Sequence, residues 1–525
     1  MSSLGALWGT EFGPATVNGH PGLAFEPRPT EFDHLLAGAD RWADREFLVQ
    51  ADRRITHGEF HAAIPAAAGL LERAGVRPGD RVLLLSYNSP EFVLALWGLW
   101  WLGAVPVFGN RWWSETELEH ALGLTKPVLA LTDRADWAPS GVTVRQLGDL
   151  SPVFGTSEDR PCARADDEDA PALILFTSGS AGVPKAVVLS RRSVIANQHN
   201  TMARTRRLPQ DLDPSRPQAV AMVCTPLFHV GGIGNIVLAL LTGTKLVFNA
   251  GKFDPGQVLE LIEAEGVQSF AGVPTMASRL IEHPDFTRRD VSSLRALPFG
   301  GAPVPPALLE RLVERLPQLK RGGLGNTWGM TESGGFMASA GAADLAERPG
   351  TVGPAASCAE IRIADPGPDG VGEVVVRAPT MMLGYLGADG TLEGVDAEGW
   401  LRTGDLGRLD ADGYLYLTGR AKDIVIRGGE NIACAHVEST MLTHPQIVEA
   451  AVFGIPHDDL GEELAAVGVH TGPAPTQDEL REFLRARLAY FEVPTAWAIT
   501  TEPLPTLAGE KIDKKTLKST FVRSE

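Results

Sequence analysis

The chain has 525 residues, more than a single hydrophobic core usually organises, so two to four domains are expected. Apolar residues make up 44% and charged residues 21%, which is typical of a globular protein. The net charge of -18 disfavours a nucleic-acid or anionic-membrane surface, because both need clustered basic residues that displace counterions.

The four cysteines, Cys162, Cys224, Cys358 and Cys434, lack the paired spacing of a zinc site or a disulfide framework. They are typical of a protein in a reducing cytoplasm. The first residues, "MSSLGALWGTEFGPATVNG", show no basic start followed by an apolar core and a small-residue cleavage site. We therefore expect a cytoplasmic protein.

The stretch "FVLALWGLWWLGAVPVF", residues 92 to 108, is uncharged and mainly apolar. A membrane span usually needs about 20 such residues, and Gly98, Gly103 and Pro106 divide this one. We predict a buried helix over residues 90–102 that ends at Gly103, followed by a short strand, "AVPVF". We expect no membrane span.

A glycine-rich loop, "TSGSAGVPKAV" at residues 177 to 187, lies between the strand-like segments "ALILFT" and "AVVLS". Its hydroxyls, free backbone N-H groups and Lys185 favour binding of phosphate. The loop of nucleoside triphosphatases would lead into a helix, whereas this one joins two strands. It therefore indicates a different class of phosphate chemistry.

Apolar strand patterns then alternate with helical stretches such as "PGQVLELIEAEG" and "PPALLERLVERL", which favours an α/β architecture. From about residue 370 short strands and turns follow, and the last 100 residues or so give a compact α+β pattern. We place a domain boundary between residues 421 and 422, which divides the chain into residues 1–421 and 422–525.

Further motifs follow along most of the chain. They are "PLFHVGG" at 226–232, "FGGAPV" at 299–304, "GNTWGMTESG" at 325–334, "GEVVVRAPTMMLGY" at 372–385, "WLRTGDLG" at 400–407, "GRAKDIVIRGGENI" at 419–432 and "GEKIDKKTL" at 509–517. With the glycine-rich loop, they resemble the signatures of the adenylate-forming superfamily, which includes acyl-CoA synthetases, beetle luciferases and peptide-synthetase adenylation domains. The resemblance, closest to stand-alone acyl-CoA synthetases, implies a large α/β N-terminal domain of two sheet subdomains and a small β-barrel, with a smaller, mobile α+β C-terminal domain.

The resemblance also implies a reaction in which a carboxylate attacks the α-phosphorus of ATP and pyrophosphate leaves. Two anions meet in this step, so preorganised positive charge is the main means of stabilising the transition state. Lys511 matches the lysine that bridges the substrate carboxylate and the α-phosphate. Glu332 matches the carboxylate that holds magnesium, and Thr331 resembles a phosphate contact. Asp405 is similar to the acceptor of both ribose hydroxyls, and Arg420 to the second ribose contact.

The resemblance implies an ATP and AMP site in which Trp328 takes the place of the usual tyrosine beside adenine. The residues that match this site are Thr177, Ser178, Gly179, Ser180, Gly182, Lys185, Gly300, Gly301, Ala302, Asn326, Thr327, Trp328, Gly329, Asp405 and Arg420.

His229 resembles a mobile residue near the acyl pocket that admits the second nucleophile. The candidate acyl-pocket residues are Phe228, His229, Phe299, Ala302, Met330 and Phe336. Because Lys511 lies in the C-terminal domain and Glu332 in the N-terminal one, domain closure is expected to complete the site. Lys422 matches the hinge of this family, and Gly428 and Gly429 match the loop presented to the acceptor.

The sequence departs from the family pattern at three places. Ser180 and Ala181 replace two threonines, and Ala186 replaces a common glycine. Glu510 stands immediately before Lys511, where relatives usually have glycine. We expect either a turn shifted to Gly509, or an ion pair between Glu510 and a nearby cation that weakens catalysis.

The segment "PLFHVGGIGN" supplies no carboxylate to pair with the amine of an amino acid. The preferred interpretation is an AMP-forming ligase that joins an uncharged fatty or aromatic acid to CoA, with ATP and magnesium. Transfer to an amine or to a carrier-protein thiol stays open, as does an inactive nucleotide-binding homologue. The expected partners are small molecules and not nucleic acid, and the oligomeric state, monomer or homodimer, is open.

Overall fold

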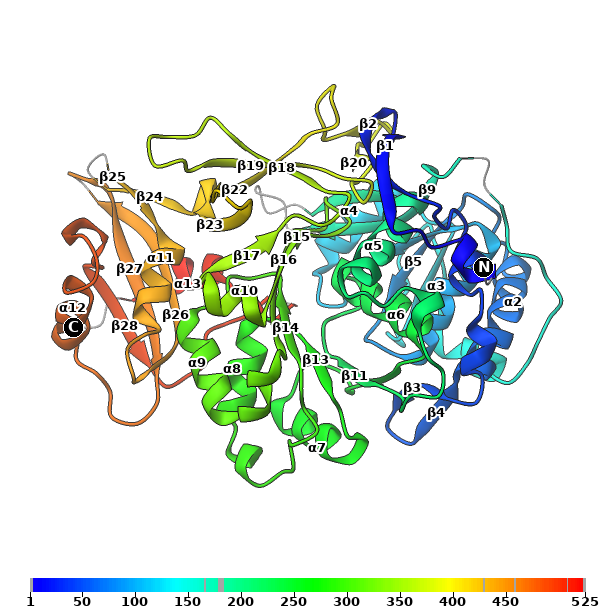
Figure 1. Cartoon of the computed structure of the whole chain (residues 1–525), viewed down its shortest axis with the longest axis horizontal. Helices are drawn as coiled ribbons and strands as arrows, with labels where there is room; N and C mark the ends of the chain where they lie inside the picture. The colour runs from blue at the N-terminus through cyan, green and yellow to red at the C-terminus, as the bar shows by residue number, and fades with distance from the viewer. Residues whose placement is uncertain are drawn as a thin grey trace.

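The computed structural model describes residues 3–164, 167–177, 184–427, 430–457, 459–507 and 509–522. Most of them form a large body of sheets covered by helices, and a smaller body in orange and red flanks it (Figure 1). The structure thus shows the large N-terminal and smaller C-terminal parts that the sequence predicts.

The first sheet of the large body has eight strands in the order β21-β20-β10-β9-β6-β5-β7-β8. Strands β9, β6, β5, β7 and β8 run parallel, whereas β10, β20 and β21 pair antiparallel at one side. Their bounds are β5 (Arg81–Leu85), β6 (Val105–Phe108), β7 (Leu129–Thr132), β8 (Thr143–Gln146), β9 (Pro171–Thr177), β10 (Lys185–Ser190), β20 (Gly384–Leu386) and β21 (Leu392–Glu393).

The second sheet has the order β13-β11-β12-β3-β4, and isolated bridges from Ser269 to Ala296 and from Gly272 to Phe299 continue it into the sheet β14-β15-β16. Strands β14 and β15 pair in parallel, so their carboxyl ends reach the same edge of the sheet. The bounds are β3 (Glu46–Gln50), β4 (Arg53–Thr56), β11 (Val220–Val223), β12 (Lys245–Phe248), β13 (Ser269–Ala271), β14 (Leu297–Gly300), β15 (Leu324–Met330) and β16 (Gly335–Gly341).

Helices cover these sheets, and short elements join them. The helices are α1 (Phe32–Leu35), α2 (His57–Arg73), α3 (Pro90–Leu102), α4 (Glu115–Thr125), α5 (Arg191–Arg204), α6 (Val230–Thr242), α7 (Pro255–Glu265), α8 (Pro274–Glu282), α9 (Pro306–Arg315) and α10 (Ala342–Glu347). The hairpin β1 (Glu11–Val17) and β2 (His20–Glu26) and the 3-10 turns η1 (Ser3–Ala6), η2 (Ala39–Trp42), η3 (Leu147–Val153), η4 (Pro209–Asp211), η5 (Pro284–Thr287) and η6 (Pro317–Arg321) complete this body.

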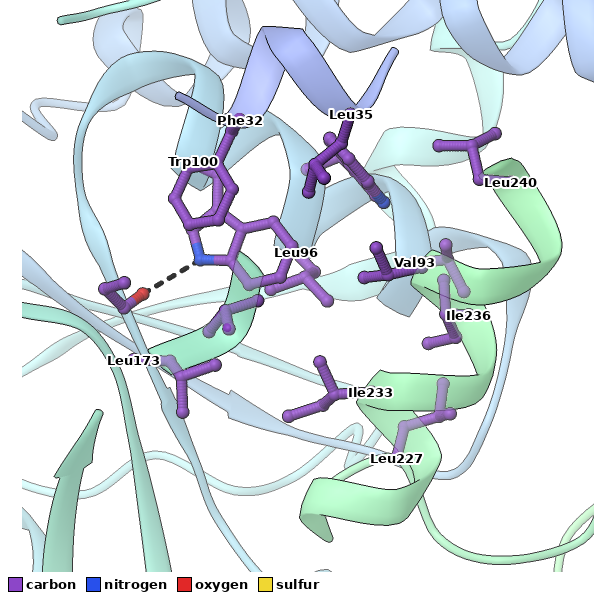
Figure 2. Close-up of a cluster of buried hydrophobic side chains, with 14 of the residues drawn as sticks. Phe32, Leu35, Val93, Leu96, Trp100, Leu173, Leu227, Ile233, Ile236 and Leu240 are labelled. Carbon is purple, nitrogen blue, oxygen red and sulfur yellow. Dashed lines mark hydrogen bonds between the residues drawn. The ribbon is translucent and has the colours of Figure 1, made fainter. Parts of the chain in front are cut away.

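Helix α3 is the predicted buried helix at residues 90–102. Ser89 caps its start, and Gly103 ends it in the left-handed region with φ 78°. Figure 2 shows Val93, Leu96 and Trp100 directed into a cluster with side chains of α1, β9 and α6. Trp100 stacks on Phe32 with ring centroids 4.3 Å apart, and its indole N-H donates to the Ala172 carbonyl at 2.8 Å. This packing fixes β9, which leads into the glycine-rich loop, relative to α6, which follows His229.

The β-subdomain is a five-stranded antiparallel sheet in the order β17-β23-β22-β19-β18, where a small barrel was expected. Its strands are β17 (Thr351–Pro354), β18 (Glu360–Ala364), β19 (Gly372–Arg377), β22 (Leu401–Leu409) and β23 (Tyr414–Arg420). The turn η7 (Ala421–Asp423) then leads to the smaller body.

The smaller body has its own sheet, β25-β24-β27-β26 with β28 beside β27. Two apolar clusters on its faces contain only residues from Val425 onward. The elements are β24 (Ile424–Arg427), β25 (Glu430–Ala433), α11 (Cys434–Met441), β26 (Ile447–His457), β27 (Gly461–His470), α12 (Gln477–Arg485), η8 (Tyr490–Glu492), β28 (Ala496–Thr500) and α13 (Lys514–Thr520).

Among the helices of the described ranges, none combines the length and apolar composition that a membrane span requires. The apolar run at residues 92–108 instead forms α3 and β6, as predicted.

Candidate active site

The glycine-rich loop connects two antiparallel strands, as its flanking sequence predicts. Thr177 at the end of β9 pairs with Lys185 at the start of β10. The predicted phosphate contacts Ser178, Gly179, Ser180 and Gly182, and the substituted Ala181, lie outside the described residues.

Lys185, Tyr385 and Glu332 form a chain of contacts beside this loop. The Lys185 ammonium lies 4.7 Å from the centroid of the Tyr385 ring, and the Tyr385 hydroxyl donates to Glu332 Oε1 at 2.8 Å. Burial and the Glu332 charge raise the pKa of Tyr385, so its phenol stays a proton donor at neutral pH. Glu332 is 8% exposed and also accepts at its backbone carbonyl from the Met382 N-H.

Glu332 is a suitable ligand for magnesium, because one oxygen is fixed by Tyr385 and the second has no side-chain donor within the described structure. The described residues contain no cluster of three or more His, Cys, Asp or Glu side chains of the kind that holds a metal by protein ligands alone. Magnesium typically uses one or two carboxylates and completes its octahedron with phosphate oxygens and water. The side chain of Glu332 fits that role.

Asp405 links Trp328 and Arg420 at the junction of two sheets. Its Oδ1 lies 2.9 Å from Arg420 Nε, and its Oδ2 accepts from the Trp328 indole N-H at 2.8 Å. Asp405 is 6% and Trp328 7% exposed, whereas the side chain of Arg420 is about half exposed. Each carboxylate oxygen keeps a free lone pair, so Asp405 can accept further hydroxyl donors.

Glycines at the end of β14 leave little room for side chains at this edge of the sheet. Gly301 has φ 77°, which favours glycine, and a Cβ at Gly300 would lie 2.8 Å from Thr327 Oγ1. Thr327 donates to the Phe299 carbonyl at 2.8 Å. The predicted nucleotide contact Asn326 donates its amide to the Thr351 carbonyl at 3.2 Å, so in this structure it joins β15 to β17.

Lys511 of the smaller body lies against this edge of the large body. A Cβ at Gly301 would lie 3.2 Å from Lys511 Cε and 3.5 Å from Nζ. Although part of the side chain stays exposed, loss of hydration lowers the pKa of Lys511, and the Arg420 charge lowers it further. The carboxylates of Asp405 and Glu332 act in the opposite direction. The lysine is thus brought among the residues that the sequence placed in one site.

His229 lies at the start of α6 and faces the turn before Lys511. A Cβ at Gly509 would lie 3.1 Å from His229 Nε2, and this nitrogen is buried without a hydrogen-bond partner in the described structure. Burial, followed by the Lys511 charge, lowers the pKa of His229 to about 3. The imidazole is therefore neutral at physiological pH.

Among the acyl-pocket candidates, Phe228 contacts His229 directly. Phe228 contacts the His229 ring at 4.6 Å and Trp112 at 5.7 Å between centroids, and Met330 and Phe336 flank the same core from β15 and β16. Ala302 is partly buried after β14, whereas Phe299 is 2% exposed within the core of the second sheet.

The hinge candidate Lys422 has its backbone in η7, between β23 and β24. The acceptor-side glycines Gly428 and Gly429 lie outside the described residues.

Sequence reasoning missed three contributors to this site. Tyr385 ends the motif "MMLGY" but gave no sign of its bond to Glu332. Trp112 lies in an aromatic pair, "WW", far from any signature. Asn88 holds the segment before His229, accepting from Leu227 N-H at 2.8 Å and donating to the Thr225 carbonyl at 3.1 Å.

Comparisons with known proteins place the chain in a family. Residues 35–386 match the model of the AMP-binding enzyme family, and residues 436–510 match that of the AMP-binding enzyme C-terminal domain. A feruloyl-CoA synthase of an Amycolatopsis species is 34% identical over 476 residues, 89% of this chain and 94% of the relative. A 2-succinylbenzoate–CoA ligase of Bacillus cereus is 30% identical and covers 92% of this chain and 97% of its own.

Comparison with solved structures leads to the same kind of enzyme. The o-succinylbenzoate CoA synthetase of Bacillus subtilis in complex with its acyl-adenylate superposes with TM-score 0.78 at 28% identity, covering 94% of this chain and 99% of that one. ATP-bound MatB of Rhodopseudomonas palustris gives 0.79 at 26% identity, with 93% and 98% covered.

The chain belongs to the AMP-binding enzyme family. The predicted family and fold class are confirmed, as is the activity of an AMP-forming acid–CoA ligase that uses ATP, magnesium and CoA.

Proposed function

We propose that this ligase activates an aromatic carboxylic acid, and that the residues gathered around Lys511 carry the first step. In that step a carboxylate oxygen bonds to the α-phosphorus of ATP, the bond to the β-phosphate breaks, and pyrophosphate leaves. In the second step the CoA sulfur attacks the acyl carbon, the bond to AMP breaks, and the thiol proton passes to solvent.

The observation that carries the proposal is the position of Lys511. It is a cation from the smaller body that lies beside Gly301 and within electrostatic reach of Asp405 and Glu332. A positive charge there offsets the negative charge that accumulates between two reacting anions. Asp405 and Arg420 hold the ribose, Trp328 covers the base side, and Glu332 with Thr331 serves the phosphates and magnesium.

An aromatic acid is supported by the side chains around His229. Trp112 packs edge-on against Phe228, whose ring contacts His229, and Met330 and Phe336 are partly buried against the same apolar core. Aromatic pairs in offset or edge-on arrangements add about 0.5–1.5 kcal/mol beyond burial, which favours a ring over a flexible chain of equal size. The two curated relatives are named for acids that contain an aromatic ring.

Asn197 supports a polar substituent on that ring. Its side chain lies between α6 and β16, in the space that a side chain at Gly335 would occupy, and it is 8% exposed. Its Oδ1 is buried without a hydrogen-bond donor among the described residues. Leaving such an acceptor unpaired is costly, so a hydroxyl group on the acid is the donor that we propose.

We further propose that Lys422 is the hinge between domains of residues 1–421 and 422–525, and that the enzyme works in the cytoplasm. The four cysteines support the second point, because all are free and buried, as suits a reducing compartment.

The test is acid-dependent exchange of labelled pyrophosphate into ATP. Cinnamic, 4-hydroxycinnamic, benzoic, 4-hydroxybenzoic and octanoic acids are compared, and CoA thioesters are then detected by mass spectrometry. We expect the fastest exchange with a hydroxylated aromatic acid, and Asn197→Leu should reduce its advantage over the acid without the hydroxyl. Octanoic acid as the best substrate would contradict the proposed acid class.

A further inference from the structure

Glu510, the residue that departs most from the family pattern, forms a contact between the two bodies. Its Oε2 lies 2.9 Å from Arg279 Nη1, and Arg279 belongs to α8 of the large body. Thr506 also donates to this carboxylate at 3.2 Å, and the Thr275 hydroxyl donates to the Glu510 backbone carbonyl. Glu510 is thus held through both its side chain and its backbone.

All three nitrogen atoms of the Arg279 guanidinium group contact the smaller body. Besides Glu510, its Nε lies 3.0 Å from Glu449 Oε1, and its Nη2 donates to the Leu504 carbonyl at 3.0 Å. Glu449 in turn accepts from the Leu504 N-H at 2.9 Å. We call Arg279, Glu449 and Glu510 the interdomain cluster.

The interdomain cluster is shielded from water. The exposed fractions of the side chains are 21% for Arg279, 6% for Glu449 and 17% for Glu510. Two carboxylates at this burial repel each other unless a cation lies between them, and a forked guanidinium can bind both. Burial raises the pKa of Glu510, and the positive charges of Arg279 and Lys252, both of the large body, act in the opposite direction. The cluster is therefore stable only while the smaller body stays seated on α8.

The backbone at Glu510 links this cluster to the lysine. Glu510 has φ 57°, in the left-handed region where a residue with a side chain is disfavoured. Its N-H donates to the Leu507 carbonyl at 2.8 Å, and the Leu507 N-H donates to the Lys511 carbonyl at 2.7 Å. This tight turn sends the next side chain, that of Lys511, towards Gly301. Fixing Glu510 therefore fixes the direction of Lys511.

The same seating also bears on the second step, because the resemblance gives His229 the role of admitting the second nucleophile. Gly509, just before Glu510, covers His229, whose Nε2 is buried. A thiol that approaches the acyl carbon past His229 needs this turn to withdraw, and withdrawal breaks the contacts of Arg279. The interdomain cluster consequently favours the first half-reaction and opposes the second.

We propose that Arg279 and Glu510 are positioning residues that hold the smaller body in the orientation for adenylation, aim Lys511 at the reacting atoms, and separate before acyl transfer to CoA. This inference rests on the proposed function. It also explains why glutamate at a position suited to glycine is compatible with activity, since the ion pair offsets the cost of the left-handed backbone.

The test compares the two half-reactions in matched variants of the full-length enzyme. Arg279→Met removes the cation but keeps an aliphatic side chain, and Arg279→Lys keeps a charge without the fork. The control is Arg289→Met, because Arg289 also binds two carboxylates, Glu260 at 2.6 Å and Glu263 at 3.0 Å, on the surface of the large body.

Pyrophosphate exchange is measured with the fastest acid of the panel, and acyl transfer with the synthetic adenylate of that acid plus CoA. We expect Arg279→Met to lower kcat for exchange about tenfold or more, the scale of a coupled ion-pair network, with little change in KM for ATP. Acyl transfer should be unchanged or faster. Arg279→Lys should fall between, and Arg289→Met should behave as the wild type.

Glu510→Gln and Glu510→Gly separate charge from backbone. Both variants lose the ion pair, but only glycine adopts the left-handed backbone without a steric cost. We expect exchange to fall in both, with glycine the less affected of the two. These variants also keep the test decisive if Arg279→Met does not fold.

A domain-position measurement adds a readout that does not depend on catalysis. Because the native cysteines are buried, dyes attached at Ser292→Cys and Ser519→Cys, both exposed positions, report the distance between the bodies. We expect a broader distance distribution in Arg279→Met than in Arg289→Met.

Equal loss of exchange and acyl transfer in Arg279→Met and both Glu510 variants, or wild-type exchange in all three, would overturn the inference. Failure of the proposed function looks different, because the wild type itself would then exchange fastest with octanoic acid or show no exchange with any acid of the panel.

Discussion

Tyr385→Phe removes a single hydroxyl from the candidate site. The lost interaction is the 2.8 Å hydrogen bond to Glu332 Oε1, whereas the aromatic face near Lys185 remains. A hydrogen bond to a charged group contributes about 1.5–3 kcal/mol, and Glu332 is 8% exposed, so solvent offers little compensation. The loss corresponds to roughly a tenfold to hundredfold effect.

We expect this effect in adenylation, because Tyr385 orients the carboxylate that we assign to magnesium. Pyrophosphate exchange measured against magnesium concentration should show a higher magnesium requirement and a lower maximal rate in Tyr385→Phe. The matched control is Tyr414→Phe, because the Tyr414 hydroxyl donates to Asp344 at 2.9 Å away from the site. Unchanged magnesium dependence in Tyr385→Phe, or an equal effect in both variants, would refute this reasoning.

Three further outcomes are expected. Burial and the Arg420 charge lower the pKa of Lys511, so pyrophosphate exchange should decline at an alkaline pH below the ordinary pKa of lysine. Lys511→Arg should move that decline to higher pH, and the pH–rate profiles of the two proteins test this prediction. Asp405→Asn weakens the bonds to Arg420 and the indole of Trp328, so KM for ATP should rise about tenfold or more, and an unchanged KM would speak against ribose binding. Burial lowers the pKa of His57 and His199 from 6.5 to about 4, so the unfolded chain binds more protons than the folded chain between these pH values. The free energy of unfolding, measured in urea, should therefore fall by about 2 kcal/mol for each histidine between pH 7 and pH 5. Equal stability at the two pH values would contradict this prediction.

The sequence alone was enough to predict several of the helices and strands, because these depend on local patterns. The helix at residues 90–102 could be predicted from its length and from Gly103, and the loop after β9 from the strands on either side. Lys511 could be assigned to a site with Glu332 only through the resemblance, since 179 positions separate them in the chain, as 511 minus 332 shows.

The partners in contacts between distant segments could not be predicted from local patterns, although the ion pair expected for Glu510 is present. Arg279 reads as an ordinary helix-surface residue, and only the folded chain brings it to Glu449 and Glu510. The left-handed backbone at Glu510 could be suspected only from the resemblance, which places glycine there, because glutamate itself rarely adopts it. Trp328 was expected to stack beside adenine. Its hydrogen bond to Asp405 arises because β15 and β22, from two different sheets, lie next to each other.

Measuring both half-reactions in Lys511→Ala shows whether a lysine from the smaller body completes the adenylation site. The assays are pyrophosphate exchange and acyl transfer from the synthetic adenylate to CoA. We predict that exchange falls by a few powers of ten, as expected for one contact that stabilises the transition state, while acyl transfer is retained. Retained exchange in Lys511→Ala, or parallel loss of both half-reactions, would contradict the role given to this lysine.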